Sequence, residues 1–272
     1  MHQPTSGRVT PTATRPVPIG ELLDAWLALQ RGDFRRGAPR LGSGDTTGSS
    51  WSPAPGEVPI LVIGCGGGAG ASTLALLLAE ASTKGRVVEC TPTAGSGLAG
   101  ASTAELGATG HGWTQGRRGD ALIQRRRDDP TGPAPAAVPV PMPGSPGGTT
   151  AVDAGSNLRS LLTGKGWLTD FTRTCPRVVL VARCTVPGVS RLEANLTSLE
   201  TDRCWAVLTH APQQLPRPVD HALGTRTREL RRLGRLHLLP REARLELAGI
   251  TTEPLPRTFY RATRTLLKGL LP

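Results

Sequence analysis

An apolar run, a glycine cluster and a helix start follow one another in the segment ILVIGCGGGAGAST, residues 60–73. This segment constrains the fold most, because glycines allow positive φ and let an anion approach the backbone closely. Loop N–H groups and the free N–H groups of the following helix then converge on one point, where they can bind phosphate. The alternative is a glycine-rich turn that packs the helix on the strand. The candidate binding residues are Gly66, Gly67, Gly68, Ala69, Gly70, Ala71, Ser72 and Thr73.

Short apolar runs alternate with helical patterns from about residue 57 onward. The strand-like runs are residues 59–63, 86–90, 151–153, 178–182, 205–208 and 236–239. The helical patterns are residues 72–82, 189–199, 219–233 and 241–247. Short apolar strands separated by amphipathic helices are typical of a parallel sheet that is covered on both faces. The sequence therefore predicts an α/β fold with a doubly wound, mostly parallel sheet and helices on both faces.

Two regions rich in Pro, Gly, Ser and Thr lie outside this pattern. Residues 1–56 are predicted to form a mostly disordered leader, since they carry too few apolar residues to offset chain entropy. Within it, residues 19–30 form an amphipathic pattern, for a helix that either docks on the domain or binds a protein partner. Residues 57–272 are predicted to form the domain. A low-complexity insertion at about 95–150 interrupts it, and we expect this to be largely disordered, with one short helix near residues 120–127.

Charge, cysteine content and the N-terminal sequence indicate which partners and which cellular compartment to expect. A net charge of +11 and a pI near 10.8 suit a polyanion or an anionic membrane surface, although an arginine-rich composition could also come from a GC-rich genome. The five cysteines show no C-x-x-C spacing, so neither a zinc site nor a disulfide framework is indicated. The N-terminus lacks the apolar segment of a signal peptide, and we expect a cytoplasmic protein.

The loop resembles the deviant phosphate loop of the ParA/MinD family of P-loop ATPases, which reads K-G-G-x-G-K-[ST]-[ST]. It is also similar to actinobacterial proteins with G-G-A-G-x-S-T loops. Further along, RVVECTPTAGSG resembles the family strand that ends in D-x-D-P, and TTAVDAGS resembles the strand with the Mg²⁺-associated aspartate. HLLPREARLELAGI is similar to the strand and proline segment beside the nucleotide base, which implies that Pro240 lies near that base.

Both family lysines are absent, because Gly66 and Ala71 stand at their positions. A charge-assisted hydrogen bond is worth roughly 1.5–3 kcal/mol, so its loss should weaken binding about tenfold to a hundredfold. Loss of one cation at the transferring phosphoryl group can lower a rate by about 10³–10⁵-fold. The resemblance implies ATP and Mg²⁺ as ligands, but we expect weak binding and little or no hydrolysis, unless an arginine such as Arg159 replaces the missing charge.

Two acidic residues are candidate catalytic residues. Asp153 and Glu89 each follow an apolar strand, and either could instead cap the turn that follows. The resemblance implies that Asp153 and Ser72 hold Mg²⁺ and that Thr73 contacts phosphate. Ser72 and Thr73 could also serve only as helix caps.

Basic surfaces offer further partners. An arginine cluster on a predicted helix could bind DNA phosphates without reading sequence, or it could be a solvated helix face; it comprises Arg226, Arg228, Arg231, Arg232 and Arg235. Residues 256–271 are predicted to form a basic amphipathic helix. This helix is expected to pack on the sheet, and contact with a membrane is the less favoured alternative. A homodimer is a further expectation from the resemblance.

Two functions from different classes follow from these residues. The first is a degenerate ParA/MinD-like P-loop protein that acts in plasmid or chromosome partition, conjugation or intracellular positioning. The second is a pseudo-ATPase scaffold that binds a protein partner without nucleotide. The effect of Mg-ATP on thermal stability distinguishes them, since a ligand that binds only the native state raises its melting temperature.

Overall fold

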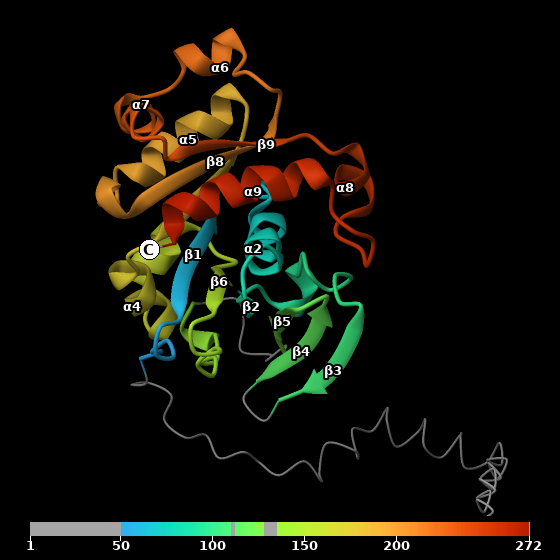
Figure 1. Ribbon diagram of the computed structural model, residues 1–272. Helices are drawn as coiled ribbons and strands as arrows, with labels where there is room; N and C mark the ends of the chain where they lie inside the picture. The colour runs from blue at the N-terminus through green and yellow to red at the C-terminus, as the bar shows by residue number, and fades with distance from the viewer. Residues whose placement is uncertain (1–49, 110–111, 128–134, 272) are drawn as a thin grey trace, which may run out of the picture. The chain divides into compact units, whose positions relative to one another are not determined.

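A nine-stranded sheet is the centre of the structure, a computed structural model that describes residues 50–109, 112–127 and 135–271 (Figure 1). The strand order is β3-β4-β5-β2-β6-β1-β7-β8-β9. The bounds are β1 Val58–Gly64, β2 Gly85–Glu89, β3 Ala104–Ala108, β4 Trp113–Arg118, β5 Ala121–Arg126, β6 Thr149–Asp153, β7 Val178–Arg183, β8 Cys204–Ala211 and β9 Leu236–Pro240. The pairs from β5 through β9 are parallel, and β3 and β4 add antiparallel pairs at one edge.

Helices cover both faces of this sheet. They are α2 Ala71–Glu80, α3 Leu158–Thr163, α4 Trp167–Thr174, α5 Val186–Leu196, α6 Arg217–His221, α7 Thr225–Arg232, α8 Ala243–Ala248 and α9 Arg257–Leu270. Short 3-10 turns lie at Thr93–Gly95, Pro135–Ala137 and Thr201–Arg203. Together these elements form the α/β architecture with a mostly parallel sheet that the sequence predicts.

The central strand β1 explains why both faces need a cover. Successive side chains of a strand point to opposite faces, so a continuous apolar run is buried on both sides. Ile60 and Val62 pack in one core with α2 and α9, whereas Leu61 and Ile63 pack in a second core with α3, α4 and α5. All four side chains are completely buried. The run ILVI therefore makes β1 an interior strand of the sheet, between β6 and β7, and brings the loop that follows it to the sheet's carboxyl edge.

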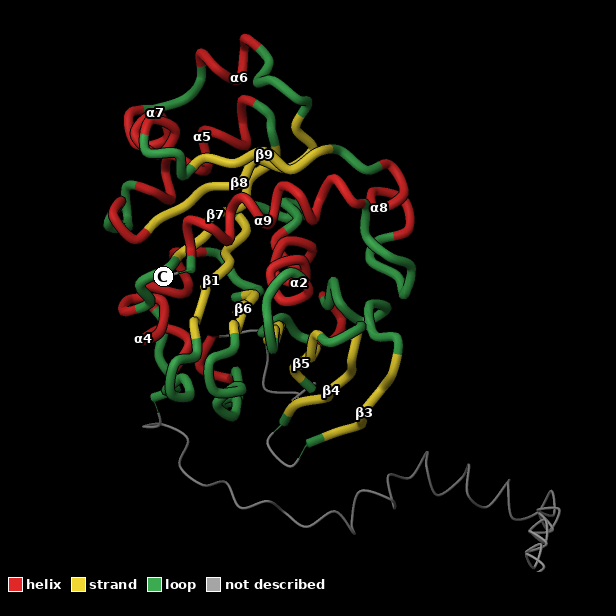
Figure 2. The backbone as a smooth tube through the Cα atoms, viewed as in Figure 1, coloured by secondary structure: helices red, strands yellow, loops and turns green. Residues whose placement is uncertain are grey.

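The insertion at residues 95–150 is not a largely disordered segment, and the short helix predicted near residues 120–127 is wrong. These residues contribute β3, β4 and β5, which Figure 2 colours as strands. Strand β5 extends the parallel part of the sheet beside β2. Strands β4 and β5 form a hairpin around Gly119 and Asp120, where Gly119 has a φ of 54°. A glycine at positive φ suits such a tight turn. Within the insertion, residues 110–111 and 128–134 lie outside the described residues.

The helix predicted at residues 219–233 is broken into α6 and α7. Glu193 on α5 causes the break, because its carboxylate accepts hydrogen bonds from the backbone N–H groups of Arg226 and Thr227, both at 2.9 Å. These are free N–H groups in the first turn of α7, so a side chain distant in sequence caps this helix. A Cβ on Gly224 would lie 2.3 Å from Cδ of Glu193, which explains the glycine at the break.

The ends of the described chain pack on the domain. Trp51 is buried and meets Phe171 with ring centroids 5.0 Å apart, so packing begins before residue 57, where the domain was expected to start. At the other end, α9 buries Phe259, Leu266 and Leu270 in the core with α2, as in the packing alternative. Membrane contact through its basic face stays a prediction. The helix expected at residues 19–30 lies outside the described residues.

No helix within the described ranges has the length and apolar character that crossing a membrane requires.

Candidate functional site

A cavity of about 830 Å³ opens at the carboxyl edge of the sheet, beside the glycine loop. Ligands of open α/β sheets bind at this edge, where the strands end and the helices begin. The whole predicted loop from Gly66 to Thr73 lines the cavity, and so do Asp153 and Pro240. Glu89 does not line it. Three segments that are far apart in the sequence thus meet around one cavity, as the site predicted from the sequence requires.

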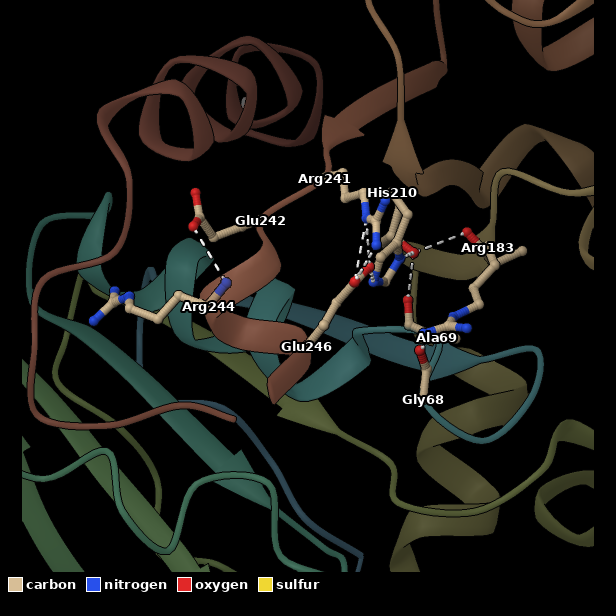
Figure 3. A network of polar contacts seen from close by, with 10 residues as sticks. Gly68, Ala69, Arg183, His210, Arg241, Glu242, Arg244 and Glu246 are labelled. Atoms are coloured by element: carbon tan, nitrogen blue, oxygen red, sulfur yellow. Dashed lines mark hydrogen bonds and ion pairs between the residues drawn. The ribbon is translucent and has the colours of Figure 1, made fainter. Parts of the chain in front are cut away.

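The loop turns its carbonyl groups toward the protein. The carbonyl oxygen of Ala69 accepts a hydrogen bond from Oγ1 of Thr209 at 2.8 Å, and that of Gly68 accepts one from Nε of Arg183 at 3.2 Å (Figure 3). The N–H groups of Gly67, Gly68 and Gly70 donate to nothing in the described parts of the chain. The loop therefore offers unpaired donors to the cavity.

Gly70 joins the loop to α2. It is the N-cap residue, has a φ of 89°, and supplies no side chain to cap the first N–H groups of the helix. A Cβ at this position would lie 3.2 Å from Cγ2 of Thr209, so the loop is packed closely against β8. Free N–H groups at a helix start carry partial positive charge and favour an anion. The loop and α2 thus meet the requirements of a phosphate site through the backbone alone.

Asp153 ends β6 at the floor of the cavity. Its side chain is buried, and its Oδ2 atom has no hydrogen-bond partner within the described residues. Burial raises the pKa of the Asp153 carboxyl, while the nearby Ser72 hydroxyl and the Gly155 N–H group lower it in part. A buried, unpartnered carboxylate oxygen beside a hydroxyl suits a hard cation such as Mg²⁺, which takes few protein ligands and keeps waters and phosphate oxygens. Ser72 and Asp153 are the residues that would hold it.

Glu89 has a structural place next to the cavity. Its Oε1 atom accepts hydrogen bonds from the N–H groups of Gly97 and Leu98 at 2.7 and 3.1 Å, and its Oε2 atom accepts one from Ser96 Oγ at 2.5 Å. The carboxylate thereby holds the turn after β2, which is the capping alternative. A catalytic role for Glu89 stays a prediction.

Glu89 should make stability depend on pH. Burial raises its pKa to about 7 from 4.5, the Ser96 hydroxyl lowers it, and the charge of Asp153 raises it. The protonated side chain therefore stabilises the fold below about pH 4.5, and this contribution is lost as the pH rises through about 7. Relative to Glu89→Gln, the wild-type free energy of unfolding should fall by about 3 kcal/mol across that window. Denaturant unfolding of both proteins in EDTA at several pH values measures this difference; a difference independent of pH would contradict the assignment.

The far wall of the cavity is apolar and carries a polar clasp at its rim. Leu239, Leu245, Ile250 and Phe259 line it near Pro240. An apolar wall of this kind suits a flat heterocyclic ring.

The clasp is a set of contacts around Glu246 of α8 (Figure 3). Glu246 accepts a hydrogen bond from NH2 of Arg241 at 2.7 Å and lies 3.2 Å from Nε2 of His210. Burial lowers the pKa of His210, and the positive charge of Arg183 lowers it further. The clasp ties α8 to the end of β8 and so fixes the far wall.

Arg183 and Arg191 line the cavity, and sequence reasoning missed both. Arg159, named from the sequence as a replacement cation, is exposed on α3 and does not line it. Arg183 directly follows the buried run of β7, so its place at the carboxyl edge of the sheet could have been inferred. Arg191 lies within α5, and only the tertiary packing of that helix brings it to the loop.

The predicted arginine cluster lies on and after α7, outside the cavity lining. Arg231 pairs with Asp220, Arg226 donates to Thr201 Oγ1, and Arg235 lies 4.7 Å above the ring of Trp205. Three of the five arginines are therefore held by contacts with neighbouring side chains. DNA binding there stays a prediction.

Several solved structures are similar to this chain at low sequence identity. A plasmid partition protein of Borrelia burgdorferi B31 bound to AMPPNP is 10% identical with a TM-score of 0.41, over 80% of this chain and 98% of that one. Apo McdA of Cyanthece is 13% identical with a TM-score of 0.49, over 78% and 99% of the two chains. A nucleotide-binding protein of Archaeoglobus fulgidus in complex with ADP is 14% identical with a TM-score of 0.42, over 74% and 90%.

No protein-family model and no curated protein matches the chain. The TM-scores of these three structures lie between 0.41 and 0.49, so the likeness assigns this chain to no family.

Proposed function

We propose that this chain is a nucleotide-responsive, ParA/MinD-like P-loop protein that binds Mg-ATP weakly and hydrolyses it little. The observation that carries the proposal is the loop itself, whose N–H groups at Gly67, Gly68 and Gly70 are unpaired in the described structure and line a cavity of nucleotide size. A backbone cradle binds phosphate without a side-chain cation, although more weakly than with one.

Slow hydrolysis follows from what lines the cavity. None of the described lining residues is a lysine. Glu89, the second acidic candidate, accepts hydrogen bonds from the backbone N–H groups of Gly97 and Leu98 instead. A P-loop lysine stabilises charge on the transferring phosphoryl group, so its absence lowers the rate more than the affinity. The chain would then act through the bound and free states rather than through rapid turnover. The process we propose is partition of a plasmid or chromosome, conjugation or intracellular positioning.

The test measures the melting temperature of the full chain with and without Mg-ATP, together with phosphate release. A native-state ligand present at about 100 times its Kd stabilises by about 2.7 kcal/mol, which raises the melting temperature by several degrees. We expect such a shift with Mg-ATP and slow phosphate release. No shift at millimolar Mg-ATP would overturn nucleotide binding and leave the scaffold that works without nucleotide.

A further inference from the structure

Two arginines, Arg183 and Arg191, line the cavity together with the glycine loop. The loop itself has Gly66 and Ala71 at the positions of the two family lysines. The three lysines of the chain are Lys84, Lys165 and Lys268, and none of them lines the cavity. Arg183 comes from the end of β7 and Arg191 from α5. The cations nearest the loop therefore come from other elements than the loop itself.

Arg191 occupies the space next to Gly66, the position of one missing lysine. A Cβ built on Gly66 would lie 3.2 Å from NH1 of Arg191 and 3.9 Å from its Cδ. The guanidinium of Arg191 therefore lies in close contact with the position that a side chain at Gly66 would take. Arg191 is exposed and makes no ion pair within the described residues, so no carboxylate there neutralises it.

Arg183 is held against the loop by a hydrogen bond. Its Nε donates to the carbonyl oxygen of Gly68, which fixes the guanidinium beside the loop (Figure 3). Its NH1 and NH2 atoms donate to no group in the part of the chain that the structure describes. The nearby carboxylate of Glu246 is already shared by Arg241 and His210. The terminal donors of Arg183 are therefore available to a bound anion.

We propose that Arg183 and Arg191 bind the phosphates of a nucleoside di- or triphosphate and replace the lysines that the loop lacks at Gly66 and Ala71. The inference rests on the nucleotide binding proposed above and adds the residues that supply its positive charge. A guanidinium presents several N–H donors to phosphate oxygens, so an arginine can substitute for a lysine as a phosphate ligand. The ligand that this arrangement selects carries at least two linked phosphates, because one phosphate would be held by the backbone loop alone.

The test is titration calorimetry of the full chain and of Arg183→Gln, Arg191→Gln and the double variant. The ligands are Mg-ATP, Mg-ADP, AMP and inorganic pyrophosphate. Each substitution should weaken Mg-ATP binding about tenfold and the double variant more, since each removes a charge-assisted contact. AMP binding should change little. Pyrophosphate binding that depends on both arginines would show that the phosphates are recognised without the nucleoside.

Two controls separate charge at this site from general effects. Arg264→Gln removes another exposed arginine, on α9 and outside the cavity lining, and should leave Mg-ATP binding unchanged. Arg183→Lys and Arg191→Lys keep the charge and should retain most of the affinity. Thermal unfolding checks that every variant is folded.

The outcomes distinguish the two proposals. If the wild type binds Mg-ATP and the double variant binds it equally well, the arginine inference is overturned while nucleotide binding stands. If the wild type binds none of these ligands, both proposals fail. Loss of AMP and ATP binding to the same degree would also contradict the inference, because the arginines would then act on the loop structure rather than on the added phosphates.

Discussion

Gly70→Asp should lower the affinity for Mg-ATP at least about a hundredfold, because two physical effects act together. The carboxylate would lie at the N-cap of α2 and accept the N–H groups that a phosphate would otherwise take. Its negative charge would also repel the phosphates. In addition, the backbone φ of 89° and the 3.2 Å approach of a Cβ to Thr209 leave little room for a side chain. Calorimetric titration of Mg-ATP into the full chain measures the loss.

Gly234→Asp is the matched control for this variant. Gly234 has a φ of 69°, and a Cβ there would meet nothing within 4 Å. It lies between α7 and β9, outside the cavity lining. The control adds the same charge to a similarly strained backbone, so it should keep wild-type affinity. Equal binding by the wild type and Gly70→Asp would show that ATP binds elsewhere than on the loop.

Asp153→Asn should separate magnesium binding from folding. If Asp153 holds Mg²⁺, the wild type binds ATP more tightly with Mg²⁺ than with EDTA, and the substitution should reduce that gain about tenfold or more. The fold should become more stable near neutral pH, because burial raises the pKa of the Asp153 carboxyl and so disfavours its charged form. If Asp153 only caps a turn, Asp153→Asn should instead lower the stability of the fold and leave the effect of Mg²⁺ on ATP affinity unchanged.

The measurements for this variant are ATP titrations with Mg²⁺ or EDTA and denaturant unfolding of the protein free of metal and nucleotide. Asp170→Asn is the control, since Asp170 is an exposed carboxylate on α4 with an exposed partner, Arg173. It removes one negative charge outside the cavity and should change neither the magnesium effect nor the affinity. A magnesium effect that survives in Asp153→Asn would remove Asp153 from the set of ligands.

The central strands and the loop could be predicted because their apolar runs and their glycines favour the same local structure. The run ILVI can only be a strand buried on both faces or a buried helix, and the glycines that follow it exclude a continuing helix. Asp153 could be placed at the cavity for a related reason. It ends a short apolar run, and the carboxyl ends of parallel strands meet at one edge.

The strands of the insertion could not be predicted from apolar alternation, because buried polar side chains interrupt the pattern. Arg118 on β4 is 4% exposed, and its Nε donates to Oε1 of Glu80 at 2.8 Å. Gln124 on β5 is also buried and accepts a hydrogen bond from NH1 of Arg86. Such residues resemble a solvated segment in sequence until their partners, which are far away in the chain, are known. The two-residue turn at Gly119 and Asp120 was the local signal that favoured a hairpin.

Tertiary contacts also decided the details of the site that the sequence left open. Glu193 breaks a helical pattern by capping α7 from another helix. Arg191 reaches Gly66 through the packing of α5, and no spacing in the sequence connects the two. Local patterns therefore gave the position of the cavity, whereas the source of its positive charge depends on the fold.

The most direct test of the account is a calorimetric titration of the full chain with Mg-ATP up to millimolar concentration. We predict saturable binding of one nucleotide per chain at these concentrations. The absence of any binding heat, together with an unchanged melting temperature at the same concentration, would contradict a working phosphate site in this loop.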